Sequence, residues 1–436
     1  MTVSTKNHKE LKEAFLLASE PAPSSSVFSD LKQQAREVLD RVGFPTIKDE
    51  EYKYTAISKR LLDKLNGFGT AESIPDIEKE LRTQDVLVGA AAGYTIVCNN
   101  GRFEPQLSSM DRDLFELTAL EDLESKAAAR IGQIEKSEFD SFTALNSLFF
   151  KNGIHIRVPD GKIVSKPILL LNFVKSTENG SCVHPRTFIE VGKNAEVTLI
   201  ERTISLGEEP VFVNSVCEWA IGQNAHARHY TLQDGRKNDL AVTNNRADVQ
   251  KDATFTSIVM SLEGEMIRNN LSLDLRASNC EGNMYGLYLL NGKTHVDNHT
   301  NVDHMQAHAE SNELYKGILT DQSRGVFNGK IFVRQDAQKT NAFQQNNNIL
   351  LSEEATVNTK PQLEIWADDV KCSHGCTTGQ LDEEALFYLR ARGIAKDAAK
   401  ALLLHAFAGE VLDQIKEESF KEYCETLVHA RLGGNY

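Results

Sequence analysis

The sequence predicts a mainly β protein with a parallel β-helix at its centre, a helical or mixed region before it and a helical domain after it. Two observations lead to this prediction. Between residues 153 and 380 helix formers become sparse, and short runs of Val, Ile, Thr and Phe alternate with Gly, Asn and Asp. Within that stretch one short phrase recurs at an interval near 30 residues. We therefore divide the chain into residues 1–150, 151–380 and 381–436.

The recurring phrase is an apolar residue, a few small or polar residues, an Asn or Asp, and usually a small residue. Its end positions are separated by 30, 28, 27, 27, 30 and 33 residues. This regularity predicts a solenoid, because a single coil cannot bury its apolar face and must stack on its neighbours. A propeller would need blades of about 40 residues, and a sandwich gives no reason for the recurrence. The phrase occupies residues 191–195, 221–225, 249–253, 275–280, 302–307, 333–337 and 366–370.

The N-terminal region has the signals of a mixed α/β segment. Residues 94–98 followed by Asn99, Asn100 and Gly101 predict a strand that enters a tight turn. Helical patterns predict helices over residues 11–18, 31–42, 57–65 and 120–134.

The segment after residue 380 is helical in pattern. Asp382, Glu383 and Glu384 favour a helix N-terminus, and Gly393 marks a stop. Residues 398–408 are apolar on nearly all sides, so they form either a buried core helix or a helix that contacts its own domain and a partner. We favour the core alternative, because exposed apolar faces are rarer.

An Asn- and Gln-rich tract at residues 341–348 has two interpretations. In stacked coils such amides can hydrogen-bond along a ladder, as they do in cross-β structures. The alternative is a polar turn, and the sequence leaves both open.

Composition excludes several classes of function. The chain carries 48 Lys and Arg against 62 Asp and Glu, a net charge of -14, which would repel a nucleic-acid backbone. The first twenty residues lack the apolar core of a secretory signal. The longest mostly apolar run, 167–174, is far shorter than the ~20 residues that a bilayer requires. Seven scattered cysteines suit a reducing compartment, so we expect a cytoplasmic protein.

Four histidines, His295, His299, His304 and His308, fall within fourteen residues and suggest a metal site. Alternate positions of a strand face opposite sides, and the first two histidines have one parity while the last two have the other. Polar rungs and turns of a solenoid explain them without a metal. A histidine-based metal-binding oligomer remains an alternative.

A second candidate site lies at the last coil, where Lys371 precedes Cys372, His374 and Cys376. Cys and His are suitable ligands for iron or an iron-sulfur species, and a neighbouring lysine favours the thiolate. Three donors do not close a tetrahedral site, so a metal here would need ligands from another chain. Inert cysteines are the commoner explanation of such a spacing.

The sequence carries no recognisable catalytic motif. It has no G-x-S-x-G, no H-E-x-x-H and no evident row of carboxylates along the coils, which argues against the main alternative, a carbohydrate-active β-helix enzyme. Residues 286–294 resemble a phosphate-binding loop, but five residues separate the glycines where four are required, and no helix pattern follows. We therefore expect that this chain binds no ATP.

A set of longer phrases covers nearly the whole chain: residues 44–45, 51–55, 144–146, 149–150, 153, 158–159, 167–168, 315–317, 323–330, 358–364, 368–375 and 387–394. Together they resemble the SufB/SufD family of iron-sulfur cluster assembly proteins. The chain is more similar to the SufD branch, because the SufB branch usually has a His-Glu-Ala phrase where this chain has residues 372–375. Two positions depart from the family pattern: Tyr52, where Trp is usual, and Cys376, where a small residue is usual.

The resemblance implies an N-terminal helical region, a right-handed parallel β-helix and a C-terminal helical domain. It also implies a non-catalytic scaffold that pairs with a SufB-like sister subunit through the β-helices. Whether the isolated chain forms a homodimer is left open by the sequence. The C-terminal helices would hold a SufC-like ABC-type ATPase, and this favours the interpretation of residues 398–408 as a helix that also contacts a partner. A transient iron-sulfur cluster is expected at the subunit interface, with His374 as the first expected ligand from this chain and Cys372 as the second.

Overall fold

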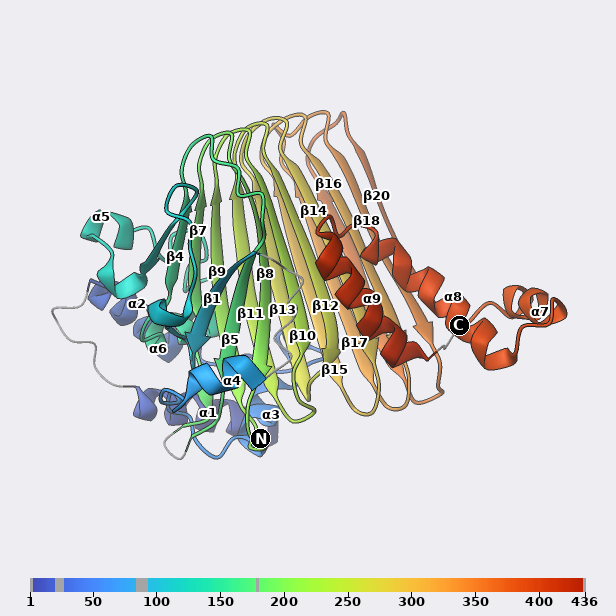
Figure 1. The fold of residues 1–436 in the computed structure, drawn as a ribbon, viewed down its shortest axis with the longest axis horizontal. Helices are drawn as coiled ribbons and strands as arrows, with labels where there is room; N and C mark the ends of the chain where they lie inside the picture. The colour runs from blue at the N-terminus through green and yellow to red at the C-terminus, as the bar shows by residue number, and fades with distance from the viewer. Residues whose placement is uncertain (1–2, 20–26, 84–92, 178–179, 434–436) are drawn as a thin grey trace.

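The chain forms a two-sided solenoid of parallel strands (Figure 1). The computed structural model describes residues 3–19, 27–83, 93–177 and 180–433. From β7 onward, successive strands alternate between two sheets. Sheet A has the order β19-β17-β15-β13-β11-β9-β7-β4-β3, with β6 paired to β9, and sheet B has the order β2-β1-β5-β8-β10-β12-β14-β16-β18-β20. The predicted mainly β solenoid, with helices at both ends of the chain, is confirmed.

The strands of the central coils are about equal in length and pair in register, as β9 does with β11 from Phe212↔Leu240 to Ile221↔Val249. The strands are β1 (Tyr94–Asn99), β2 (Arg102–Phe103), β3 (Glu116–Ala119), β4 (Ile154–Val158), β5 (Ile168–Val174), β6 (Cys182–Val183), β7 (Arg186–Val191), β8 (Glu196–Ser205), β9 (Phe212–Ile221), β10 (His226–Asp234), β11 (Leu240–Val249), β12 (Thr254–Glu263), β13 (Met266–Leu275), β14 (Glu281–Leu290), β15 (His295–His304), β16 (Glu310–Leu319), β17 (Arg324–Val333), β18 (Asn341–Leu350), β19 (Thr356–Ile365) and β20 (Lys371–Gly379).

The helices lie before and after these coils. They are α1 (Val3–Ala18), α2 (Ser29–Val42), α3 (Ile57–Lys64), α4 (Ile77–Thr83), α5 (Ser125–Ala128), α6 (Ser141–Phe149), α7 (Glu383–Ala391), α8 (Lys396–Leu412) and α9 (Glu418–Leu432), with short 3-10 turns η1 (Glu50–Tyr52), η2 (Pro105–Leu107) and η3 (Leu120–Asp122). The strand predicted at residues 94–98 is β1, and it pairs in parallel with β5 of the solenoid.

The recurring sequence phrase forms one corner of each coil. Asn194, Asn224, Asp252 and Asn279 have φ values of 55°, 55°, 59° and 60°, in the left-handed region that Asn and Asp tolerate better than most residues. The small residue that follows each of them is buried between the sheets. In the next two coils the left-handed residues are His308 and Lys339, just beyond the predicted phrases.

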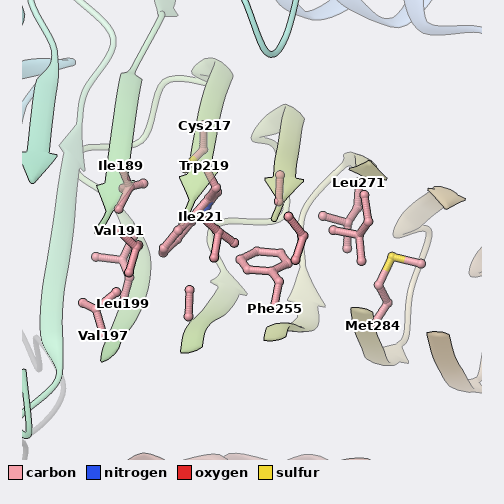
Figure 2. Close-up of a cluster of buried hydrophobic side chains, with 14 of the residues drawn as sticks. Ile189, Val191, Val197, Leu199, Cys217, Trp219, Ile221, Phe255, Leu271 and Met284 are labelled. Atoms are coloured by element: carbon pink, nitrogen blue, oxygen red, sulfur yellow. The ribbon is translucent and has the colours of Figure 1, made fainter. Parts of the chain in front are cut away.

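Apolar side chains from alternate strand positions fill the space between the two sheets. Figure 2 shows Ile189, Val191, Trp219 and Phe255 in this lumen, all of them buried. A side chain in one coil packs on those of the coils above and below, so each coil depends on its neighbours for burial.

The lumen becomes polar toward the C-terminal coils. Asn346 Nδ2 donates to the hydroxyl of Tyr288 at 3.0 Å, and Asn348 Nδ2 donates to Asn346 Oδ1 at 2.8 Å. The Asn-rich tract therefore forms the buried side of β18, and the polar-turn interpretation is wrong.

The N-terminal helices cover the outer face of sheet A. Phe15, Leu61 and Phe142 of α1, α3 and α6 share one buried cluster with Phe212 and Met266 of β9 and β13. The side chain of Asp140 caps α6 by accepting from the Phe142 N–H.

The helix predicted over residues 120–134 is wrong, since only η3 and the four-residue α5 are helical there. The backbone N–H groups of Gly132, Ile134 and Glu135 instead donate to the carboxylate of Glu218 at 3.0–3.1 Å. Glu218 also pairs with Arg186 at 2.5 Å, and both side chains are fully buried. Hydrogen bonds to a buried carboxylate that is distant in sequence thus override the local helix propensity.

The C-terminal helices α8 and α9 cover the outer face of sheet B (Figure 1). Leu404, Ala408 and Phe420 share a buried cluster with Tyr230 and Leu289 of that sheet. Residues 398–408 therefore pack on their own domain, as both interpretations require, while other side chains of this helix are only partly buried. In Figure 1, α7 projects beyond β20 at the C-terminal end of the solenoid.

Candidate functional site at the last coil

The last coil is one end of the solenoid, and β3 and β2 end sheets A and B at the other. In the described part of the chain, β19 and β20 are the terminal strands of sheets A and B, and each pairs on one edge only, with β17 and β18. Their outer edges present unpaired backbone N–H and C=O groups, which is the arrangement that pairs with another strand. Pro361 lies in β19, where an edge position tolerates the missing N–H.

The strand β20 places Cys372, His374 and Cys376 on one face. Cys372 is in register with Ala342, which is fully buried in the lumen core, and His374 is in register with the buried Gln344. The three side chains therefore extend the lumen row of the solenoid at this end. His374 and Cys376 are exposed, and Cys372 is half-buried.

Burial raises the pKa of the Cys372 thiol, and this differs from the thiolate expected beside Lys371. Alternate residues of a strand are separated by about 6.6 Å along the backbone, so the three donors are spaced along β20. Within the described ranges no group of three or more His, Cys, Asp or Glu side chains is arranged to hold a metal ion. The described residues of this coil thus do not form a complete set of iron ligands.

The four clustered histidines do not come together. His295 and His299 lie on the outer face of sheet A, beneath the N-terminal segment. His304 lies in the lumen, where its Nε2 is 2.9 Å from Ser311 Oγ, and His308 occupies an exposed corner. Burial lowers the pKa of His295 to about 4 and that of His304 to about 3, so both imidazoles are neutral near pH 7.

A buried charge network that the sequence did not predict joins the N-terminal segment to sheet A. Arg268 Nη1 donates to Asp297 Oδ2 at 2.7 Å and to the Glu51 carbonyl at 2.8 Å, and its guanidinium lies 3.8 Å from the centre of the Tyr52 ring. The hydrogen bond from His299, together with Lys330, lowers the pKa of Glu51 to about 2. The phrase at residues 51–55 therefore docks the N-terminal region on β13, β15 and β17.

The Tyr52 hydroxyl also donates to Asp140, the N-cap of α6. The departure from the usual Trp thus supplies a hydrogen bond, in addition to packing.

The expectation that the coils carry no row of carboxylates is wrong. Asp248, Asp274 and Asp303 are in register on β11, β13 and β15. Each is paired with an arginine: Arg276 contacts Asp248 and Asp274 at 2.9 and 2.8 Å, and Arg334 contacts Asp303 at 2.7 Å. The arginines thus offset the negative charge of the row.

The C-terminal helices offer a second exposed feature. Asp382 caps α7 by accepting from the N–H groups of Glu384 and Ala385, and α7 buries none of its residues. Phe387 is 73% exposed and Tyr388 is 56% exposed, which is unusual for two adjacent rings.

Neither a phosphate-binding loop at residues 286–294 nor a membrane-spanning helix is present in the described part of the chain. The segment at residues 286–294 is the end of β14 and a turn into β15, so it has no helix N-terminus for a phosphate. Across the described part of the chain, no helix combines the length and apolar character needed to span a bilayer.

Comparison with known proteins agrees with this architecture. The family model described as "SUF system FeS cluster assembly, SufBD core domain" matches residues 173–407, and "SufBD protein N-terminal region" matches residues 17–170. The chain is 32% identical to the iron-sulfur cluster assembly protein SufD of Escherichia coli, over 92% of each chain. It is 29% identical to a SufBD family protein of Synechocystis, over 98% of this chain and 96% of the relative. The chain therefore belongs to the SufB/SufD family of iron-sulfur cluster assembly proteins.

Proposed function

We propose that this chain is a non-catalytic scaffold subunit of a cytoplasmic iron-sulfur assembly complex. It pairs with a SufB-like sister subunit through its last coil, and it docks a SufC-like ATPase through its C-terminal helices. The observation that carries the proposal is the open coil, which combines unpaired edges on β19 and β20 with a row of iron-compatible donors.

An open solenoid end favours association with a second β-helix. Exposed strand edges are otherwise a liability, and soluble proteins cover or pair them. A sister chain of similar shape would extend both sheets across the junction, and it would bring its own side chains over His374 and Cys372. When the sister is absent, the same edge can pair with a second copy of this chain.

The donor set fits an iron-sulfur cluster as cargo better than a resident ion. Cys thiolates are the usual ligands of such clusters, and His replaces Cys in some of them. His374 and Cys372 leave the ligand set incomplete, so a cluster held between two subunits would be released when the subunits move apart. The half-buried Cys372 would ionise on binding iron, because metal binding displaces the thiol proton.

The ATPase contact is assigned to α7 and the adjoining surface of α8. α8 and α9 are anchored on sheet B, while Phe387 and Tyr388 of α7 contact solvent. Exposed aromatic side chains on a rigid support are typical anchors of protein interfaces. Hydrolysis of ATP would belong to the partner.

The cluster assignment is tested with the complex purified anaerobically from its own cells. We expect the double variant Cys372→Ser/His374→Ala to retain its partners and to lose at least tenfold in bound iron and acid-labile sulfide. The matched control is His226→Ala, an exposed histidine of sheet B far from the open coil. Full cluster formation in the double variant would refute the assigned ligands.

A further inference from the structure

A row of three polar side chains leads from the lumen to His374. Glu313 of β16 is in register with Gln344 of β18, and Gln344 is in register with His374 of β20. In-register residues of a parallel sheet point to the same face, so these side chains are successive rungs. Glu313 and Gln344 are 4% and 1% exposed, whereas His374 is exposed because its strand ends the sheet.

The amide of Gln344 has a defined orientation. Its Nε2 donates to Glu313 Oε2 at 2.6 Å. This contact places the nitrogen side of the amide toward Glu313 and turns Oε1 away from it. On the side opposite Glu313, the next rung of the row is His374.

The Gln344 oxygen is a buried acceptor without a partner in the described part of the chain. Leaving a buried acceptor unpaired is unfavourable, so such an atom in a polar row calls for a donor. His374 does not hydrogen-bond to it in this structure, and an imidazole N–H turned inward from that neighbouring rung would supply a donor.

The opposite sheet leaves room for this amide. A Cβ placed on Gly329 of β17 would lie 2.4 Å from Gln344 Nε2. The absence of a side chain at Gly329 therefore allows the Gln344 amide to occupy this position in the lumen.

We propose that Gln344 is a positioning residue for His374. Its Oε1 accepts a hydrogen bond from one ring N–H of His374, which leaves the other ring nitrogen unprotonated and directed outward to iron. Glu313, on the preceding rung, holds the other side of the Gln344 amide. Histidine ligands commonly donate their second ring N–H to such an acceptor, which fixes the tautomer and raises ligand basicity. The inference rests on the proposed role of His374 as a ligand.

The test reads the imidazole tautomer of His374 directly, in the full chain without iron. Long-range proton–nitrogen NMR correlations of labelled histidine distinguish the two neutral tautomers, and His374→Asn identifies the signal. We expect His374 to favour one tautomer, and Gln344→Met to reduce that preference about fivefold, which is the typical effect of one hydrogen bond. Gln345→Met is the matched control, since this neighbouring glutamine is exposed on the opposite face of β18.

The variant Gln344→Met leaves Glu313 buried without its donor, and this could unfold the coil. The double variant Glu313→Leu/Gln344→Met removes both partners and avoids an orphan carboxylate, so it provides the same test in a folded chain. A tautomer ratio unchanged in the folded variants would overturn the inference.

The outcome is separate from that of the proposed function. If Gln344 controls the tautomer but His374→Ala retains full iron in the complex, the ligand assignment fails while the hydrogen bond stands. If His374→Ala loses iron and the tautomer does not respond to Gln344, only the positioning role fails.

Discussion

Glu218 shows how a single side chain decides local structure. Its carboxylate is fully buried and accepts from the backbone of residues 132–135 as well as from Arg186. The run of alanines at 127–129 predicts a long helix, but the sequence around it does not reveal a carboxylate 86 residues away. Helix propensity is worth tenths of a kcal/mol per residue, and a buried charge satisfied by several donors outweighs it.

Replacement of Glu218 by Ala should therefore destabilise the fold strongly. The change leaves Arg186 as an unpaired buried cation, and breaking a buried pair costs about 3–5 kcal/mol in the free energy of unfolding. Urea unfolding followed by circular dichroism measures this value. Glu353→Ala, at an exposed corner residue, should change it by less than about 0.5 kcal/mol. Equal effects of the two substitutions would contradict the assigned role of Glu218.

The buried His304 should make stability depend on pH. Burial lowers its folded-state pKa to about 3, against 6.5 in the unfolded chain, so below pH 6.5 the unfolded state binds a proton that the folded state excludes. The contribution of the neutral His304 to the free energy of unfolding is complete above pH 6.5. It declines by up to about 1.4 kcal/mol per pH unit as the pH falls toward 3.

The variant His304→Asn should flatten this decline, while the exposed-residue control His226→Asn should not. Free energies of unfolding between pH 7 and pH 4.5 measure both slopes. The decline should not vanish, because His184 is also buried with a pKa lowered to about 3. An unchanged slope in His304→Asn would contradict the burial argument.

At the level of elements, the sequence predicts the repeated coils of the solenoid. It does not determine which helices pack on which face of the sheets. The corner phrase predicts the coils because a left-handed Asn or Asp followed by a buried small residue is a local requirement. The face of sheet B that receives α8 is set by apolar residues spread over many coils, such as Tyr230 and Leu289. No local pattern links those residues to residues 398–408.

The helix α7 should be dispensable for folding and required for partner binding. We expect Phe387→Ser/Tyr388→Ser to change the free energy of unfolding by less than about 0.5 kcal/mol, because both rings are exposed. The same variant should lose the ATPase in pull-downs and retain the sister subunit. Tyr54→Ser, which removes an exposed ring at the N-terminal end of the chain, is the control.

Retention of the ATPase in the α7 variant would show that the docking site lies outside α7. Deletion of residues 382–436 is a poorer test, because it would also expose the apolar face of sheet B.

For the whole molecule, the sequence predicted the solenoid, its flanking helices and the two candidate ligands on β20. It did not predict that both outer faces of the solenoid are covered while the last coil is left open. That asymmetry arises because residues 51–55 and the C-terminal helices each pack on strands of the solenoid that are distant in sequence. Under the proposed function, the last coil is the surface where association takes place.

The most direct measurement is photocrosslinking of the tagged full chain in its own cells, with a photoreactive residue in place of the exposed Ser373 on β20. We predict a crosslink to a SufB-like sister, in a complex that also yields the ATPase, iron and sulfide after anaerobic purification. The same probe in place of Glu37 on α2 should give no such crosslink. A chain recovered alone, or a sister that crosslinks only through α2, would contradict the claim that the open coil is the assembly surface.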